Sequence, residues 1–251
     1  MLIQQVKSRV KGIKDRIARA AAKAGRSSDA VRLIAVSKYA GCTDGFVPAL
    51  LEAGCFALGE GRPQNLLEKY DYFTLHAAEH QLPSVPIEWH LIGSLQRNKI
   101  RKLLPFVVLL HSIDSMKLLE ALNRIADEEA EVGHLAGKEK IDMLLEVNIA
   151  EEESKHGFDP SALISLIPQM KRFQRIRICG LMGMAALNAP DEKVRKQFAL
   201  LRELRDQCND RYPEFPDLKE LSMGMSHDFE IAVEEGATYV RIGSSLYPEG
   251  I

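Results

Sequence analysis

Lys38 is the residue whose position in this sequence most directly suggests chemistry. It ends a run, Leu-Ile-Ala-Val-Ser-Lys at 33–38, that is typical of a buried parallel strand. Because side chains alternate along a strand, Ile34, Val36 and Lys38 are expected on one face. An ammonium group that continues an apolar row must reach water or have a chemical role. Two interpretations stand: a solvated lysine at a strand end, or a lysine whose amine forms a Schiff base with a carbonyl ligand.

Small and hydroxyl-bearing residues follow two later predicted strands. The segment at 222–226 reads Ser-Met-Gly-Met-Ser and leads into a predicted helix near His227. Its backbone N–H groups and the Ser226 hydroxyl could therefore face an anion. Gly243 and Ser244 form a similar pair after the last predicted strand. Each feature alone also fits an ordinary helix cap or turn, but their coincidence at adjacent strand ends favours a phosphate site.

Arg241 is expected on the same strand face as Gly243, two residues further on. A guanidinium group there needs an acceptor, which could be a phosphate, a ring nitrogen or a carboxylate such as Glu60. A Schiff-base lysine, a phosphate cradle and this arginine together describe a site for pyridoxal 5′-phosphate (PLP). Since arginine keeps its proton, it would leave the pyridine nitrogen unprotonated and weaken the cofactor as an electron sink. Met225 is either a packing residue or a contact of the cofactor ring.

Strand-like and helix-like segments alternate along the chain and predict the elements that position these residues. The expected strands are 32–38, 55–60, 87–93, 107–113, 141–148, 176–184, 218–223 and 238–243. The expected helices between them are 44–53, 62–70, 97–104, 115–132, 160–170, 191–209 and 227–235. This alternation indicates a closed (β/α)8 barrel, a TIM barrel, rather than an open doubly wound sheet. Functional residues of such barrels gather at the carboxyl ends of the strands.

A further helix is predicted at 2–24, where apolar residues recur at steps of three and four. The sequence stops soon after the last predicted strand and leaves no room for an eighth helix there. The N-terminal helix is therefore expected to fill that position. No linker or composition break divides the chain, which predicts a single PLP-binding domain over 1–251.

Composition excludes several classes of function. The 251 residues carry a formal net charge of −2, with 46% hydrophobic residues, which gives no reason to expect nucleic-acid or membrane binding. The four cysteines are scattered without a CxxC pair, so neither a metal site nor a disulfide framework is predicted. There is no signal-peptide segment and no apolar run long enough to span a bilayer, so the expected location is cytoplasmic.

The residues named above belong to a series of motifs that extends over essentially the whole chain. The motifs lie at 33–38, 59–60, 89–99, 111–115, 147–148, 153–158, 180–182, 221–228 and 240–243. In these motifs and their order the chain resembles the pyridoxal phosphate homeostasis proteins (the YggS/PROSC family), which share the fold of the alanine racemase barrel domain. The resemblance implies a barrel of the alanine racemase N-terminal domain type, with an extra N-terminal helix and no second β domain.

The resemblance also implies roles for individual residues. Lys38 would carry the cofactor as a Schiff base, and Arg241 would face its pyridine nitrogen. The phosphate would be held by Ser226, Gly243 and Ser244. Two positions depart from the usual family pattern: Gly61 replaces an asparagine after Gly59-Glu60, and Ser244 replaces a threonine while keeping its hydroxyl.

Three functions remain open. The first is a monomeric, non-catalytic protein that binds PLP and serves vitamin B6 and amino-acid homeostasis, with PLP-dependent enzymes as one class of cofactor recipient. The second is an amino-acid racemase that acts through the same lysine. Racemisation needs a second base, and in the alanine racemase family this is a tyrosine from an additional β domain, which this chain is expected to lack. The third is a phosphate-binding barrel of another metabolic class, with Lys38 as a general acid or base.

Overall fold

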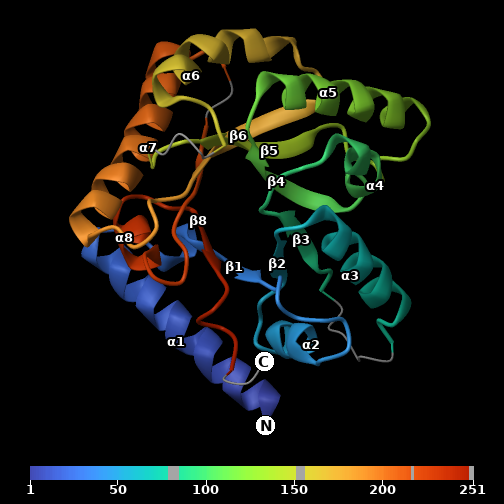
Figure 1. Cartoon of the computed structure of the whole chain (residues 1–251), viewed down its shortest axis with the longest axis vertical. Coiled ribbons are helices and arrows are strands. Elements are labelled where there is room, and N and C mark those ends of the chain that lie inside the picture. Colours follow the sequence, from blue (N-terminus) through green and yellow to red (C-terminus); the bar gives the residue numbers. More distant parts are fainter. Residues whose placement is uncertain (79–84, 151–155, 216–217, 249–251) are drawn as a thin grey trace.

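A closed parallel barrel forms the centre of the computed structural model, which describes residues 1–78, 85–150, 156–215 and 218–248. Within these residues the strands pair in sequence order, and β8 pairs back to β1 (Figure 1). The strands are β1 (Arg32–Val36), β2 (Ala57–Glu60), β3 (Glu88–Leu91), β4 (Val107–Ile113), β5 (Ile141–Val147), β6 (Ile176–Gly183), β7 (Glu220–Ser222) and β8 (Tyr239–Ile242). The predicted (β/α)8 barrel is confirmed.

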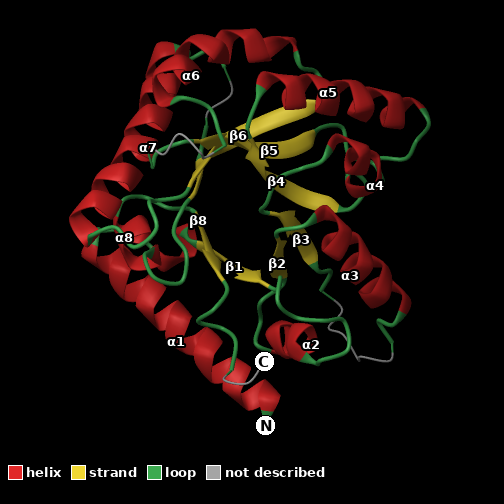
Figure 2. Ribbon diagram, in the orientation of Figure 1, coloured by secondary structure: helices red, strands yellow, loops and turns green. Residues whose placement is uncertain are grey.

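Helices surround the barrel, as Figure 2 shows. The α-helices are α1 (Leu2–Lys23), α2 (Phe46–Glu52), α3 (Pro63–Leu75), α4 (Ile100–Leu103), α5 (Met116–Glu131), α6 (Pro160–Leu166), α7 (Asp191–Arg211) and α8 (Phe229–Glu234). Short 3₁₀ helices lie at η1 (Ser28–Ala30), η2 (Arg97–Lys99) and η3 (Ile167–Arg172). No helix in these described ranges is long and apolar enough to cross a membrane.

The N-terminal helix α1 occupies the outer position that would follow β8. It packs between α2 and α8 (Figure 1), because Val6, Val10, Ile13 and Ile17 recur at steps of three and four and are all buried. The sequence placed this helix correctly.

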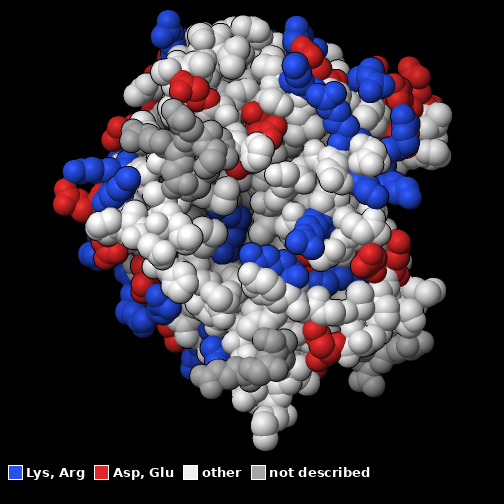
Figure 3. All heavy atoms as spheres, viewed as in Figure 1, with Lys and Arg blue, Asp and Glu red and all other residues white. Residues whose placement is uncertain are grey.

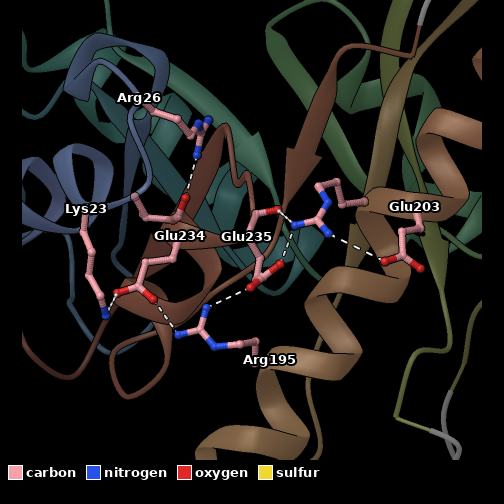
Figure 4. A network of polar contacts seen from close by, with 8 residues as sticks. Lys23, Arg26, Arg195, Glu203, Glu234 and Glu235 are labelled. Carbon is pink, nitrogen blue, oxygen red and sulfur yellow. Dashed lines mark hydrogen bonds and ion pairs between the residues drawn. The ribbon is translucent and has the colours of Figure 1, made fainter.

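Ion pairs hold α1, α7 and α8 together on the outer surface (Figure 4). Glu234 on α8 binds Lys23 of α1 at 2.7 Å and also pairs with Arg195 of α7. Arg195 reaches Glu235 as well, at 2.8 Å. Just beyond α1, Arg26 donates to the Val233 carbonyl at 2.7 Å. Since the pairs share partners, they restrain one another more than isolated surface pairs would.

The barrel interior is partly polar, unlike the apolar layer between strands and helices. Leu109, Leu144 and Met182 form a small apolar cluster of their own. The buried charged or polar residues of the strands include His90, His111, Ser222 and Arg241. Buried polar groups must find hydrogen-bond partners, so these side chains constrain one another.

Two predicted boundaries next to the site were wrong. The strand predicted at 32–38 ends at Val36, and Lys38 lies in the turn that follows. That turn closes when the Ala40 N–H donates to the Ser37 carbonyl at 2.9 Å. The helix predicted from 227 begins at Phe229. Residues 153–155 of the 153–158 motif lie outside the described residues.

Candidate functional site

Lys38 is exposed at the carboxyl end of β1. Its Nζ lies 4.8 Å from the centre of the Tyr39 ring, a cation–π distance. Among the described residues no carboxylate forms an ion pair with this ammonium group. Lys38 has therefore left the apolar row of Ile34 and Val36 and reaches solvent at the mouth of the barrel, where a ligand could meet its amine.

A buried ion pair lies directly beneath Lys38. Lys69 of α3 and Glu60 of β2 pair with one another and are 3% and 0% exposed. The Lys69 ammonium also donates to the Ser37 carbonyl at 2.6 Å, and the Ser37 hydroxyl donates to Glu60 Oε1 at 2.6 Å. The pair therefore fixes the backbone immediately before Lys38. The sequence had left open a Glu60–Arg241 ion pair; in the structure Glu60 pairs with Lys69, and Arg241 binds Ser222 and Gly183.

The ends of β7 and β8 meet through Ser226. Its Oγ accepts from the backbone N–H groups of Gly243 and Ser245, at 3.3 and 3.4 Å. Gly224 has a φ of +93°, and a Cβ there would lie 2.6 Å from the Cβ of Ala232. Only glycine fits this turn without displacing α8. Ser226 and Gly243 are therefore brought together as the sequence suggested, while Ser244 is exposed beside them.

Ser226, Gly243 and Ser244 form the candidate phosphate cradle, which lies next to the end of β1. A Cβ built on Gly243 would lie 3.5 Å from the Cβ of Val36, because β8 and β1 are hydrogen-bonded neighbours. Met225 is half-buried in the β7–α8 loop, and its N–H is bound by the Asp228 carboxylate. Lysine and cradle thus belong to the same mouth of the barrel. Figure 3 shows basic side chains around a hollow over the middle of the molecule.

Arg241 points into the barrel and is 4% exposed. Its guanidinium group donates to Ser222 Oγ at 2.7 Å and to the Gly183 carbonyl at 3.2 Å. Burial lowers the pKa of Arg241 to about 10, against the opposing effect of Asp228 and Glu146. The group therefore keeps its charge at neutral pH. These two acceptors use only part of the five N–H donors of a guanidinium, which leaves donors for a ligand.

A cavity of about 200 Å³ lies on the other side of the same mouth, where β3 to β6 end. Its lining residues are Ile92, Gly93, Ser94, Ser112, Glu146, Val147, Asn148, His156 and Met184. Burial, with Asp114 nearby, raises the pKa of the Glu146 carboxyl. The cavity wall carries the Ser94 and Ser112 hydroxyls and the Asn148 amide beside the Glu146 carboxyl, polar groups that could orient a small ligand.

The family of alanine racemase N-terminal domains matches this chain over residues 3–249. The chain belongs to that family. A family member from Aquifex aeolicus, a pyridoxal phosphate homeostasis protein, is 36% identical over 96% of each chain. Another with the same name, from Escherichia coli, is 31% identical over 94% of this chain and 92% of its own.

Solved structures extend the comparison. PipY of Synechococcus elongatus, in a structure with PLP bound, superposes with a TM-score of 0.75 at 33% identity and covers 94% of this chain and 100% of PipY. An unknown protein from Bifidobacterium adolescentis gives a TM-score of 0.85 at 34% identity, over 98% of this chain and 96% of its own. Alanine racemase of Clostridium difficile, at 15% identity and a TM-score of 0.66, shares the fold and is covered over 58% of its length.

The structure thus places the six predicted site residues around one mouth, although their roles stay predictions. Sequence reasoning missed Ser37, Lys69 and Ser245. Lys69 was hidden within the helix predicted at 62–70, where a lysine normally faces water. A signal for it existed in hindsight: buried Glu60 ends an apolar strand and needs a cation nearby.

Gly61, which stands where the family usually has asparagine, can be tested by restoring that asparagine. A Cβ built at Gly61 meets nothing within 4 Å, whereas one at neighbouring Gly93 would lie 2.1 Å from the Gly61 carbonyl oxygen. We expect Gly61→Asn to change the free energy of unfolding by no more than about 1 kcal/mol. Gly93→Ala should cost about 3 kcal/mol, because backbone cannot move aside cheaply. Urea unfolding of both variants checks this; equal losses would contradict the open space at Gly61.

Proposed function

We propose that this chain is a PLP-binding protein of vitamin B6 and amino-acid homeostasis that holds the cofactor as a Schiff base on Lys38. It acts as a single domain over 1–251, as a monomer in the cytoplasm, without strong catalytic activity of its own. PLP-dependent enzymes are the class of recipient that such a carrier would supply.

One observation carries the proposal: the adjacent ends of β1 and β8 bring an accessible lysine beside a cradle of hydroxyl and amide groups. Lys38 is exposed, and Gly243 lies against Val36 two residues earlier. This donor set fits an aldehyde-bearing phosphate ester, since it offers one amine together with the hydroxyl donors of Ser226 and Ser244. A PLP-bound relative that is 33% identical over 94% of the chain supports the same ligand.

Arg241 explains why activity would be weak. Bound PLP supplies an electron sink for negative charge at the α-carbon of an amino acid. The Arg241 guanidinium can only donate hydrogen bonds and keeps its charge at neutral pH, with a pKa of about 10. Facing a ring nitrogen, it would require that nitrogen to accept and therefore to stay unprotonated. The protein then favours holding the cofactor over using it.

An amino-acid racemase acting through Lys38 is the second candidate, favoured by Tyr39. This phenol belongs to an exposed side chain directly beside the lysine, and racemisation needs an acid or base on each face of the α-carbon. Exchange of the alanine α-proton in D₂O, followed by NMR, separates the two functions. An enzyme-like exchange rate that requires Tyr39 would replace the binding proposal with the racemase.

The visible spectrum of the purified protein mixed with PLP is the primary test. Binding on Lys38 should give a yellow protein with the absorbance band of a protonated Schiff base. A protein that stays colourless and retains no PLP after gel filtration would contradict both functions above and favour a phosphate-binding barrel of another class.

Replacing Ser226 by alanine tests the phosphate cradle. Ser226 Oγ accepts from the Gly243 and Ser245 amides and keeps its own proton to donate to a phosphate, so its loss should weaken PLP binding by about 1–3 kcal/mol. Ser244→Ala should weaken it within the same range. Equilibrium titration monitored by absorbance measures both, and Ser8→Ala, an exposed serine on α1, is the control. Unchanged affinity in both cradle variants would place the phosphate elsewhere.

A further inference from the structure

A continuous hydrogen-bonded chain of side chains crosses the interior of the barrel. Arg241 Nη1 lies 2.7 Å from Ser222 Oγ, which lies 2.8 Å from His111 Nδ1. His111 Nε2 lies 3.0 Å from His90 Nδ1. The four residues are at most 4% exposed. Ser222 on β7 and His111 on β4 belong to strands that are not neighbours, so this contact spans the barrel.

The hydrogen bonds between these four side chains all run in one direction, from Arg241 to His90. Arginine can only donate, so Ser222 Oγ accepts from Arg241. The Ser222 hydroxyl has one proton, and its remaining partner is His111 Nδ1, which must accept it. A neutral His111 then carries its proton on Nε2 and donates it to His90 Nδ1. His90 in turn carries its proton on Nε2.

Both imidazoles are held neutral. Burial is the main cause that lowers the pKa of His111 well below its usual value, and the charges of His90 and Arg241 add to it. Burial likewise lowers the pKa of His90, although Glu88 opposes the effect. The ring of Tyr239 packs beside both imidazoles, with centroids 5.7 and 6.1 Å away, and excludes water from that side.

The series of hydrogen-bonded side chains ends at His90, toward the opposite mouth of the barrel. His90 Nε2 has no hydrogen-bond partner among the described residues. The carboxylate of Glu88, which also pairs with Arg32, lies 4.0 Å from it. Glu88 and Arg32 are the first residues of β3 and β1. The Nε2–H of His90 therefore points toward a negative charge, which agrees with the direction set by Arg241.

We propose that Ser222, His111 and His90 are positioning residues that fix the Arg241 guanidinium in one orientation, with every proton of the chain assigned. Because the Ser222 hydroxyl donates its only proton to His111, its oxygen remains an acceptor for Arg241. The guanidinium N–H groups that bind neither Ser222 nor the Gly183 carbonyl then stay available for a ligand. This role rests on the proposed function, in which Arg241 faces the cofactor ring nitrogen.

Nitrogen-15 NMR of the histidine side chains in the PLP-free protein tests the proton assignment without any substitution. We expect His90 and His111 to be neutral, protonated on Nε2 and unprotonated on Nδ1, from pH 7 to 8. A proton on Nδ1 of either ring within that range would overturn the proposal. This measurement does not depend on PLP binding, so it stands apart from a failure of the proposed function.

Two substitutions of His111 then test the positioning role. Asparagine places an acceptor near the position of Nδ1 and can still receive the Ser222 proton, whereas glutamine reaches the position of Nε2 and leaves Ser222 without that acceptor. We expect His111→Asn to bind PLP within about 3-fold of the unmodified protein and His111→Gln to bind about 10-fold more weakly. The wavelength of the PLP absorbance band should shift only in His111→Gln.

Thermal unfolding of both His111 variants must accompany the titrations, because either substitution changes a buried site. A larger loss of affinity in His111→Asn than in His111→Gln, or equal affinities in the two, would overturn the positioning role. If the unmodified protein binds no PLP at all, the proposed function fails, while the NMR result still decides whether the proton chain exists.

Discussion

Substituting alanine for Lys38 is expected to abolish the visible absorbance of the PLP-loaded protein and to weaken PLP binding by at least about 100-fold, which is about 2.8 kcal/mol. Lys38 is the exposed amine beside the cradle at the ends of β7 and β8, and the covalent link depends on it. Absorbance titration and gel filtration with PLP measure the two effects.

The variant Lys38→Arg separates the contribution of the covalent link to PLP binding from the contribution of the positive charge. Lys38→Arg keeps the positive charge but supplies no amine for a Schiff base, so it should lose the absorbance band while retaining part of the affinity. Lys196→Ala is a matched control, since Lys196 is an exposed lysine of α7 that pairs with Glu192. A yellow Lys38→Ala protein would show that another lysine carries the cofactor.

Breaking the buried Glu60–Lys69 pair should have the largest effect on stability. Lys69→Met leaves the fully buried Glu60 carboxylate without its cation and removes the donor to the Ser37 carbonyl. Loss of one partner of a buried pair costs about 3–5 kcal/mol. Chemical unfolding at pH 7 should show this loss.

The double variant Lys69→Met with Glu60→Gln distinguishes the uncompensated charge from lost packing. The glutamine is neutral and can still accept from the Ser37 hydroxyl, so part of the stability should return. Lys196→Met, at an exposed i,i+4 pair, should cost no more than about 0.5 kcal/mol. If Lys69→Met unfolds at the same denaturant concentration as Lys196→Met, the pair does not support the end of β1.

The fold was largely readable from the sequence because its signals are local. Alternating strand and helix periods predicted every strand of the closed barrel, with differences of only a few residues at their ends. The N-terminal helix was equally readable, because its apolar residues recur at steps of three and four. Boundaries failed where a tertiary contact decides them: the turn after Val36 is fixed by the Ser37 carbonyl, which binds both Ala40 and Lys69.

Only some residues of the candidate site could be predicted from the sequence. Lys38, Ser226, Arg241 and Gly243 stood out because each is an unusual residue at a strand end. Ser37, Lys69 and the interior histidines did not, because each looks ordinary until its partner is known. His111, for example, meets Ser222 from a position 111 residues away in the chain, and no spacing rule connects two strands that face one another across a barrel.

By itself, then, the sequence determined the barrel, the lysine at the end of its first predicted strand and the small residues near the ends of its last two, since these depend on residue type and local period. The tertiary structure alone decided which buried charges meet. Glu60 is neutralised by Lys69 rather than by Arg241, and Arg241 is bound by a hydroxyl and a carbonyl instead of a carboxylate. The physical reason is that a buried polar group takes its partner from whatever the closed barrel brings within about 3 Å, and only the three-dimensional packing of the strands sets that distance.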